Sequence, residues 1–179
     1  MKKSLLLTLL LLGFGSATFA QDRPNADLFR DVSAQVNRYP FFTIFDSVSA
    51  QVDAGYVTLS GKVTMPHKAS DIEKRIARIN GVKGVRNTIA VLPVSSFDDG
   101  LRLGIARALY AHPALWRYGL GTNPSIHVIV ERGRVTLDGV VNNEMDRIIA
   151  GFVARSSLAF DVKNELKTND EMRQQVEQL

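Results

Sequence analysis

The chain contains the same nine-residue pattern twice. Residues 55–63 read GYVTLSGKV and residues 133–141 read GRVTLDGVV, so six of the nine positions are identical. Each copy has a helical pattern before and after it, and each is followed by a short strand pattern, at 85–89 and 162–166. A repeat of this length is a complete folded unit rather than one turn of a solenoid. We therefore expect two related small domains in tandem.

Hydrophobic periodicity predicts the same order of elements in both units. In the first unit, apolar residues recur at helical spacing over 27–38 and 68–80, and they alternate over 48–52, 56–63 and 85–91 as in half-buried strands. The second unit repeats this order. Strands with one apolar face and two amphipathic helices form a two-layer sandwich. The predicted class is α+β, with two tandem αββαβ sandwiches, each a three-stranded sheet with two helices on one face.

These elements divide the chain into six segments. We expect a signal peptide at 1–20, a polar leader at 21–26, a first domain at 27–92, a linker at 93–97, a second domain at 98–168 and a charged tail at 169–179. The linker is short, so the two domains should be in contact or nearly so. The tail is interpreted as either a short helix or a disordered segment.

The first twenty residues have the layout of a cleavable secretory signal. Lys2 and Lys3 precede an apolar stretch over 5–14, and small residues lead to a cleavage position after Ala20. The apolar stretch is too short for a comfortable membrane span, so we expect no transmembrane segment after cleavage. In a Gram-negative bacterium the exported protein would be periplasmic.

Composition narrows the possible functions further. The chain has no cysteine, so disulfides and lipid attachment through a cleavage-site cysteine are excluded. Removing the two signal lysines from 22 basic residues leaves 20 against 18 acidic ones, a net charge of +2. A nearly neutral surface is untypical of a nucleic-acid binder, which needs a dense basic patch.

The repeated glycines and asparagines are interpreted as structural. Gly55 and Gly133 lie at expected hairpin turns, where positive φ is needed. Gly61 and Gly139 lie inside strands, where the missing side chain permits close approach of a helix or marks a bulge. Asn87 and Asn164 occupy the apolar side of the closing strands, where a buried amide must be hydrogen-bonded. We expect them to tie the backbone of a neighbouring loop.

No set of residues indicates an active site, a cofactor site or a metal site. His67, His112 and His127 have no second ligand at metal-binding spacing. No Gly-x-Ser-x-Gly motif is present. The pair Asp98-Asp99 is interpreted as a helix cap rather than as an acid and base, and Asn142 or Asn143 should cap the next helix.

The best candidate for a contact surface is an aromatic segment of the second unit. It comprises Leu115, Trp116, Arg117 and Tyr118, with Arg107 on the preceding helix. Trp and Tyr favour the membrane interface, and arginines favour anionic headgroups. The other interpretation is that Trp116 packs into its own domain or against the first unit.

A second aromatic segment, residues 41–45 of the first unit, is expected to be buried, and the contact between the two units is one place where it could be buried. His127 alternates with apolar strand residues, so it should face solvent or the other unit.

The αββαβ order, the Gly-x-Val-Thr-Leu-x-Gly-x-Val hairpin and the Val-x-Asn-x-Leu/Ile closing strand resemble the BON domain. The resemblance covers nearly the whole mature chain, twice. It implies a non-enzymatic envelope module that is usually periplasmic and is associated with phospholipid surfaces and with envelope or osmotic stress.

The leading hypothesis is therefore a periplasmic binding module that docks on anionic phospholipid or on envelope proteins. The modest net charge predicts weak, salt-sensitive association, because surface charges are screened over about 8–10 Å. The alternatives are a chaperone-like role, which would need the 41–45 segment exposed, and an adaptor in a larger surface complex.

Overall fold

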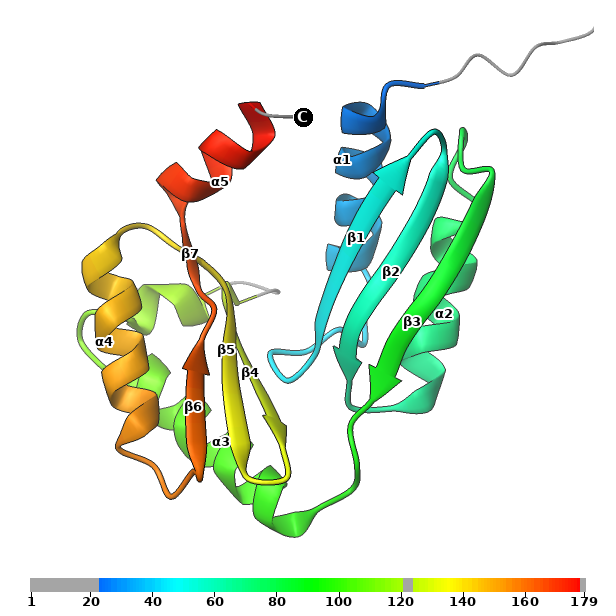
Figure 1. Cartoon of the computed structure of the whole chain (residues 1–179). Helices are drawn as coiled ribbons and strands as arrows, with labels where there is room; N and C mark the ends of the chain where they lie inside the picture. The colour runs from blue at the N-terminus through cyan, green and yellow to red at the C-terminus, as the bar shows by residue number, and fades with distance from the viewer. Residues whose placement is uncertain (1–22, 121–123, 178–179) are drawn as a thin grey trace, which may run out of the picture.

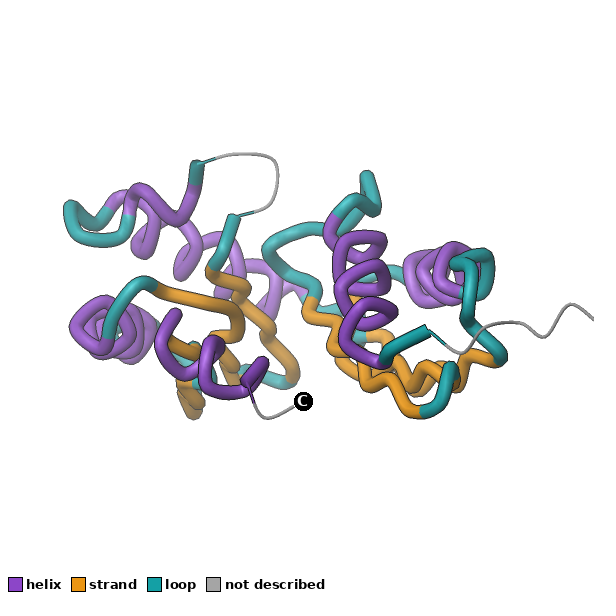
Figure 2. The backbone as a smooth tube through the Cα atoms, turned by 90° about the horizontal axis from the view of Figure 1, so that it is seen from above, coloured by secondary structure: helices purple, strands orange, loops and turns teal. Residues whose placement is uncertain are grey.

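The computed structural model describes residues 23–120 and 124–177. These residues form two units that lie side by side, each with helices against a sheet (Figures 1 and 2). The expected signal peptide lies outside the described residues. The class predicted from the periodicity, two tandem α+β sandwiches, is confirmed.

The first unit follows the expected order of helix, strand, strand, helix, strand. Its sheet has the order β1-β2-β3, with β1 antiparallel and β3 parallel to the central strand. The parallel pair is joined through the second helix, which covers the same face as the first helix (Figure 1). The elements are α1 (Asn25–Asn37), β1 (Ser47–Asp53), β2 (Tyr56–Val63), α2 (Pro66–Ile76) and β3 (Gly84–Val91).

The second unit repeats this arrangement and adds elements at its end. A 3-10 helix, η1, precedes the first strand, and a two-residue strand pairs with β5 beyond the end of β6. The tail forms a helix. The elements are α3 (Ser96–Ala111), η1 (Trp116–Gly119), β4 (Ile126–Glu131), β5 (Arg134–Val141), α4 (Glu144–Arg155), β6 (Asp161–Asn164), β7 (Lys167–Thr168) and α5 (Asn169–Glu177).

Each unit has its own hydrophobic core. The first helix of each unit contributes three buried residues at i, i+4 and i+8, which are Leu28, Val32 and Val36 in α1 and Leu101, Ile105 and Leu109 in α3. This equal spacing aligns α1 with α3 at a shift of 73 residues. The hairpin glycines Gly55 and Gly133 align the hairpin strands and the second helix of each unit at a shift of 78. Each residue can therefore be compared with its counterpart.

The repeated glycines have the backbone conformations that their positions predict. Gly55 and Gly133 take positive φ at the two hairpin turns. Inside the strands, Gly61 and Gly139 have φ of +126° and +121°. A Cβ there would collide with the carbonyl oxygen of Ser47 or Ser125 on the neighbouring strand. The close approach is therefore made by a strand backbone, and not by a helix.

The two asparagines hold the second helix of each unit to the closing strand. Asn87 Nδ2 donates to the carbonyl of Ala69 in α2 at 3.0 Å. Asn164 Nδ2 donates to the carbonyl of Arg147 in α4 at 2.8 Å. In both cases the side-chain oxygen accepts from a backbone N–H two residues later. The role is structural, as expected, but the partner is a helix carbonyl rather than a loop.

The expected cap of α3 is wrong. Ser95 caps the helix, because its hydroxyl accepts from the N–H of Asp98 at 3.2 Å. Asp98 is buried, and its carboxylate accepts from the N–H groups of Arg132 and Gly133 at 2.8 and 2.7 Å. It therefore ties the β4–β5 turn to the helix. Asn143 caps α4, as expected.

A buried ion pair fastens the connector between α1 and β1 to the start of α2. Lys68 Nζ donates to Asp46 Oδ2 at 2.6 Å, and both side chains are almost wholly buried. The N–H groups of Thr43 and Thr64 also donate to Asp46. Burial alone would raise the pKa of Asp46, but Lys68 and these threonines outweigh it and hold the pKa below its ordinary value.

The strand glycines give a first test of the fold. Gly139→Ala should destabilise the protein by about 1–3 kcal/mol, because alanine is strained at this φ and its Cβ meets a backbone oxygen. The matched control is Gly104→Ala in α3, where a Cβ meets no atom within 4 Å outside its own helix backbone. That control should stabilise by about 0.5–1 kcal/mol. Urea unfolding measures the change in the free energy of unfolding for both variants. Equal changes would contradict the structural role given to Gly139.

The buried ion pair gives a second test. Asp46→Asn should cost about 3–5 kcal/mol at neutral pH, because it leaves Lys68 buried and unpaired. The folded-state pKa of Asp46 is depressed, so its contribution is fully present above the unfolded carboxyl pKa of about 3.9. The contribution is lost as pH falls from there through the folded value.

The unfolding free energies of the wild type and of Asp46→Asn should therefore begin to converge as the pH falls below about 3.9. Asp27→Asn, at an exposed carboxylate paired with Arg30, is the control and should change stability by less than about 1 kcal/mol. A gap between wild type and Asp46→Asn that persists unchanged into acid would contradict the role given to this carboxylate.

Candidate functional site

Two residues of the predicted contact segment belong to the core. Leu115 is fully buried, and Tyr118 is buried with its hydroxyl donating to Asp146 Oδ2 at 2.5 Å. Burial and this hydrogen bond raise the pKa of Tyr118. Arg117 is half-exposed but paired with the same carboxylate. The structure thus corrects the prediction for Leu115 and Tyr118, which hold η1 to the unit and do not reach its surface.

The other two predicted contact residues lie on the surface. Trp116 is 54% exposed, so the alternative in which it packs into the core does not hold. Its neighbour Arg117 bonds to Asp146, which places the tryptophan near the start of α4. Arg107 is exposed on α3, and it forms no ion pair within the described ranges.

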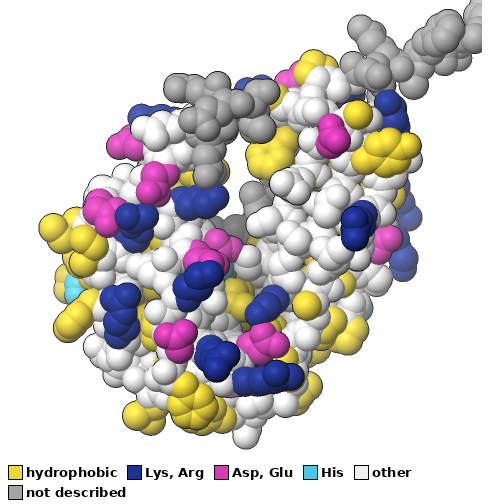
Figure 3. Space-filling view, in the orientation of Figure 1, with side chains coloured by type: hydrophobic (Ala, Val, Ile, Leu, Met, Phe, Trp, Pro, Cys, Tyr) yellow, Lys and Arg dark blue, Asp and Glu magenta, His cyan; other side chains and the backbone are white. Residues whose placement is uncertain are grey.

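A larger apolar surface, which the sequence reasoning missed, lies along α4. Met145, Ile148 and Phe152 are spaced i, i+3 and i+7 and are 63%, 54% and 71% exposed. Figure 3 shows hydrophobic side chains gathered at the edge of the molecule over this helix. We call these three residues the α4 stripe. The sequence could have indicated this exposed surface, because apolar residues cover more of α4 than one core-facing side of the helix needs.

The first unit shows that the fold does not require this stripe. By the shift of 78, the counterparts of Met145, Ile148 and Phe152 in α2 are His67, Ser70 and Lys74. These three polar residues lie on the outward face of α2. The same backbone position is thus polar in one unit and apolar in the other, so folding alone does not explain the stripe.

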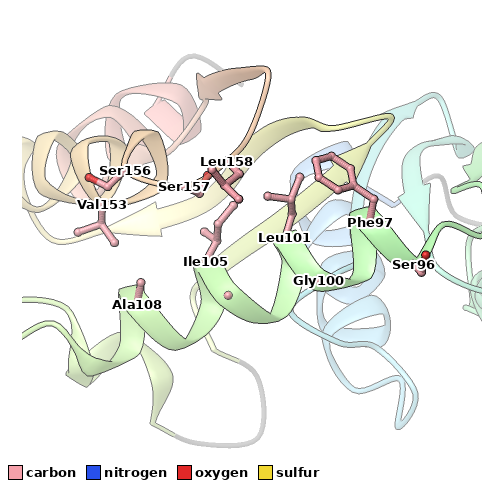
Figure 4. A pocket seen from close by; sticks show the side chains of 11 residues that line it. Ser96, Phe97, Gly100, Leu101, Ile105, Ala108, Val153, Ser156, Ser157 and Leu158 are labelled. Atoms are coloured by element: carbon pink, nitrogen blue, oxygen red, sulfur yellow. The ribbon is translucent and has the colours of Figure 1, made fainter.

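An apolar groove adjoins the stripe, between α3 and α4. It has a volume of about 540 Å³. In Figure 4, Val153 extends from α4 towards Ala108 on α3, with Leu158 and Phe97 towards the other end. We call this the α3–α4 groove. It is lined by Ser96, Phe97, Gly100, Leu101, Gly104, Ile105, Ala108, Val153, Ser156, Ser157 and Leu158.

The corresponding groove of the first unit has the opposite character. It lies between α1 and α2, has a volume of about 460 Å³ and is lined by Asp31, Ala34, Gln35, Arg38, Arg75, Arg78 and Ile79. Asp31 stands where α3 has Gly104, and Arg75 stands where α4 has Val153. Both helix-facing grooves therefore exist, but only that of the second unit is apolar.

The 41–45 segment joins the two units. The carbonyl of Ile44 accepts from the N–H of Val128 on the free edge of β4 at 2.7 Å. Phe42 contacts the ring of His127, with centroids 5.4 Å apart, and Phe45 packs against the core of the second unit. Of the aromatic residues in this segment, Phe41 alone is largely exposed. His127 thus faces the other unit.

Charged groups add to this contact beside the aromatic segment. Lys62 of β2 pairs with Glu131 of β4, and this hydrogen bond lowers the pKa of Glu131. The hydroxyl of Ser47 donates to Asp138 on β5. The open face of the second sheet is therefore partly covered by the first unit, while the α3–α4 side faces away (Figure 2).

Within residues 23–120 and 124–177, no helix combines the length and apolar character needed to cross a membrane. In the same ranges, no cluster of three or more His, Asp or Glu side chains is arranged to hold a metal ion.

Two solved structures similar to the chain are of CdsD, a structural protein of the type III secretion system of Chlamydia trachomatis. Its C-terminal domain is 16% identical, over 78% of this chain and 64% of that chain, with a TM-score of 0.31. The chain thus spans less than two thirds of that structure. A second CdsD structure is 14% identical, over 84% of this chain and 97% of that chain, with a TM-score of 0.28.

Comparison with curated proteins gives no match. The family model of the BON domain matches the chain twice, over residues 25–93 and 104–170. The two matches fall on the two repeated units and together cover most of the chain. The chain therefore belongs to the BON domain family.

Proposed function

We propose that this chain is an exported, periplasmic binding module that docks on anionic phospholipid surfaces of the envelope through its second unit. Family membership supports the coarser part of this proposal, a non-catalytic module associated with the envelope. The α4 stripe carries the finer part, because it is an exposed apolar surface that the equivalent helix of the first unit lacks.

The chemistry of this face suits a membrane interface. Apolar side chains on an exposed helix face can insert into the boundary between headgroups and acyl chains. Trp116 lies near the start of the same helix, and tryptophan favours that boundary. Full burial of a side chain such as isoleucine or phenylalanine gains about 1.5–3 kcal/mol. A few such contacts would bind the protein reversibly to the membrane surface.

Exposed positive charge on α3 and α4 favours anionic lipid. Arg107 on α3 and Arg155 at the end of α4 are exposed, and neither forms an ion pair within the described part of the chain. Each basic residue near an anionic surface contributes about 1 kcal/mol. The contact set proposed here therefore keeps Trp116 and Arg107 from the sequence prediction and adds the α4 stripe.

The chaperone-like alternative has less support. It depended on an accessible 41–45 segment, and three of its four large apolar residues are partly buried at the contact between units.

The proposal predicts that apolar residues of α4 drive vesicle binding. The double variant Ile148→Ser with Phe152→Ser should weaken binding to phosphatidylglycerol vesicles at least tenfold, because it removes two inserting side chains. The measurement is co-sedimentation of the chain from Gln21 onward, with phosphatidylcholine vesicles for comparison. Trp116 is the single tryptophan, so a blue shift of its fluorescence reports directly on this face.

The matched control changes two exposed apolar residues elsewhere, Phe41→Ser with Val94→Ser, and should bind as wild type does. Binding should prefer anionic vesicles and weaken as salt rises, since the Debye length falls to about 3 Å at 1 M. Equal loss in both double variants, or no binding to either vesicle, would overturn the proposal and favour a protein partner.

A further inference from the structure

Neither a positive φ nor a close contact requires the two glycines in the α3–α4 groove. Gly100 and Gly104 lie in the middle of α3 with helical backbone, and a Cβ at either would meet no atom within 4 Å beyond the helix itself. Each costs about 0.5–1 kcal/mol of helix stability relative to alanine. Their counterparts in α1 are Asp27 and Asp31, so the repeat does not demand glycine there.

The effect of these glycines is to keep the groove open down to the backbone of α3. Its walls are apolar, with Leu101 and Ile105 below and Val153 and Leu158 opposite (Figure 4). The volume of about 540 Å³ lies within the usual range of small-molecule sites.

The groove offers few free polar groups to an occupant. The hydroxyls of Ser156 and Ser157 donate to the carbonyls of Phe152 and Ala154 in their own helix. The third serine, Ser96, is exposed at the open end of the groove. An extended peptide would leave its backbone N–H and C=O groups without partners here. A hydrocarbon chain has no such groups to satisfy.

An exposed cation lies on the same helix as the two glycines. Arg107 stands three residues after Gly104 in α3, and it forms no ion pair within the described ranges. An apolar channel beside an unpaired guanidinium matches a molecule with a hydrocarbon chain and an anionic head. The α4 stripe continues the apolar surface on the other side of Val153.

We infer that the α3–α4 groove holds one acyl chain of an anionic phospholipid, packed against the bare backbone at Gly100 and Gly104, with its phosphate near Arg107. This inference rests on the proposed membrane docking and deepens it. The stripe would provide general insertion, whereas the groove would select a single lipid molecule.

The test uses a soluble lipid, so that groove binding is separated from vesicle docking. Dihexanoyl phosphatidylglycerol, kept below its micelle concentration, is titrated into ¹⁵N-labelled protein. Amide shifts are expected at Gly100, Gly104 and Leu158. Gly104→Leu fills the groove and should weaken this binding at least tenfold, while raising the thermal midpoint of unfolding because leucine is the better helix former. The matched control, Asp31→Leu, places the same side chain in the groove of the first unit and should bind as wild type does.

The outcomes separate the two proposals. Vesicle binding without lipid-induced shifts in the groove would overturn the acyl-chain site and leave the docking proposal standing. Equal binding by Gly104→Leu and wild type would overturn it too. Absence of both kinds of binding would overturn both proposals. A concentration-dependent dimer in sedimentation velocity that Gly104→Leu abolishes would show that a second copy of the chain occupies the groove instead.

Discussion

A buried charged group at the start of the second helix fixes the connector before the first strand in both units. In the first unit this group is Lys68, which donates to Asp46. In the second unit the equivalent position is Asp146, which accepts from Arg117 and Tyr118 of η1. The sign of the charge is reversed and the connection is retained. A buried charge that lost its partner would cost several kcal/mol, so the connectors have little freedom to move.

The two fixed connectors have different consequences. In the first unit, the connector directs the 41–45 segment onto the free edge of β4, where Ile44 adds a backbone hydrogen bond and covers an edge that would otherwise be exposed. In the second unit, the connector leaves Trp116 on the surface near the α4 stripe. The first unit thus supports the second, and the second presents the exposed apolar face.

The sequence predicted what the repeat itself determines. Gly61, Gly139, Asn87 and Asn164 recur because each unit needs them, and a structural role for each could be expected from position, although the partner of each could not. The candidate site was predicted less well. Periodicity shows that a residue is on an apolar side of a helix, but it does not show whether another element covers that side. Leu115 is covered by its own core, whereas Ile148 and Phe152 are left uncovered. The sequence predicts Asp98 as a helix cap, but a carboxylate can equally accept hydrogen bonds from a distant turn, and only the fold brings the N–H of Gly133 to it.

The repeat also separates what folding requires from what it merely permits. Where both units keep a residue type, as at the strand glycines, the backbone geometry explains it. Where they differ on the same exposed face, as at Lys74 and Phe152, the core is unaffected by the choice. An exposed phenylalanine lowers solubility and two glycines inside a helix lower its stability, and the first unit has polar residues at the equivalent positions. These costs fall together on the α3–α4 side of the second unit, where insertion of the α4 stripe into a membrane would offset the first and an acyl chain in the groove the second.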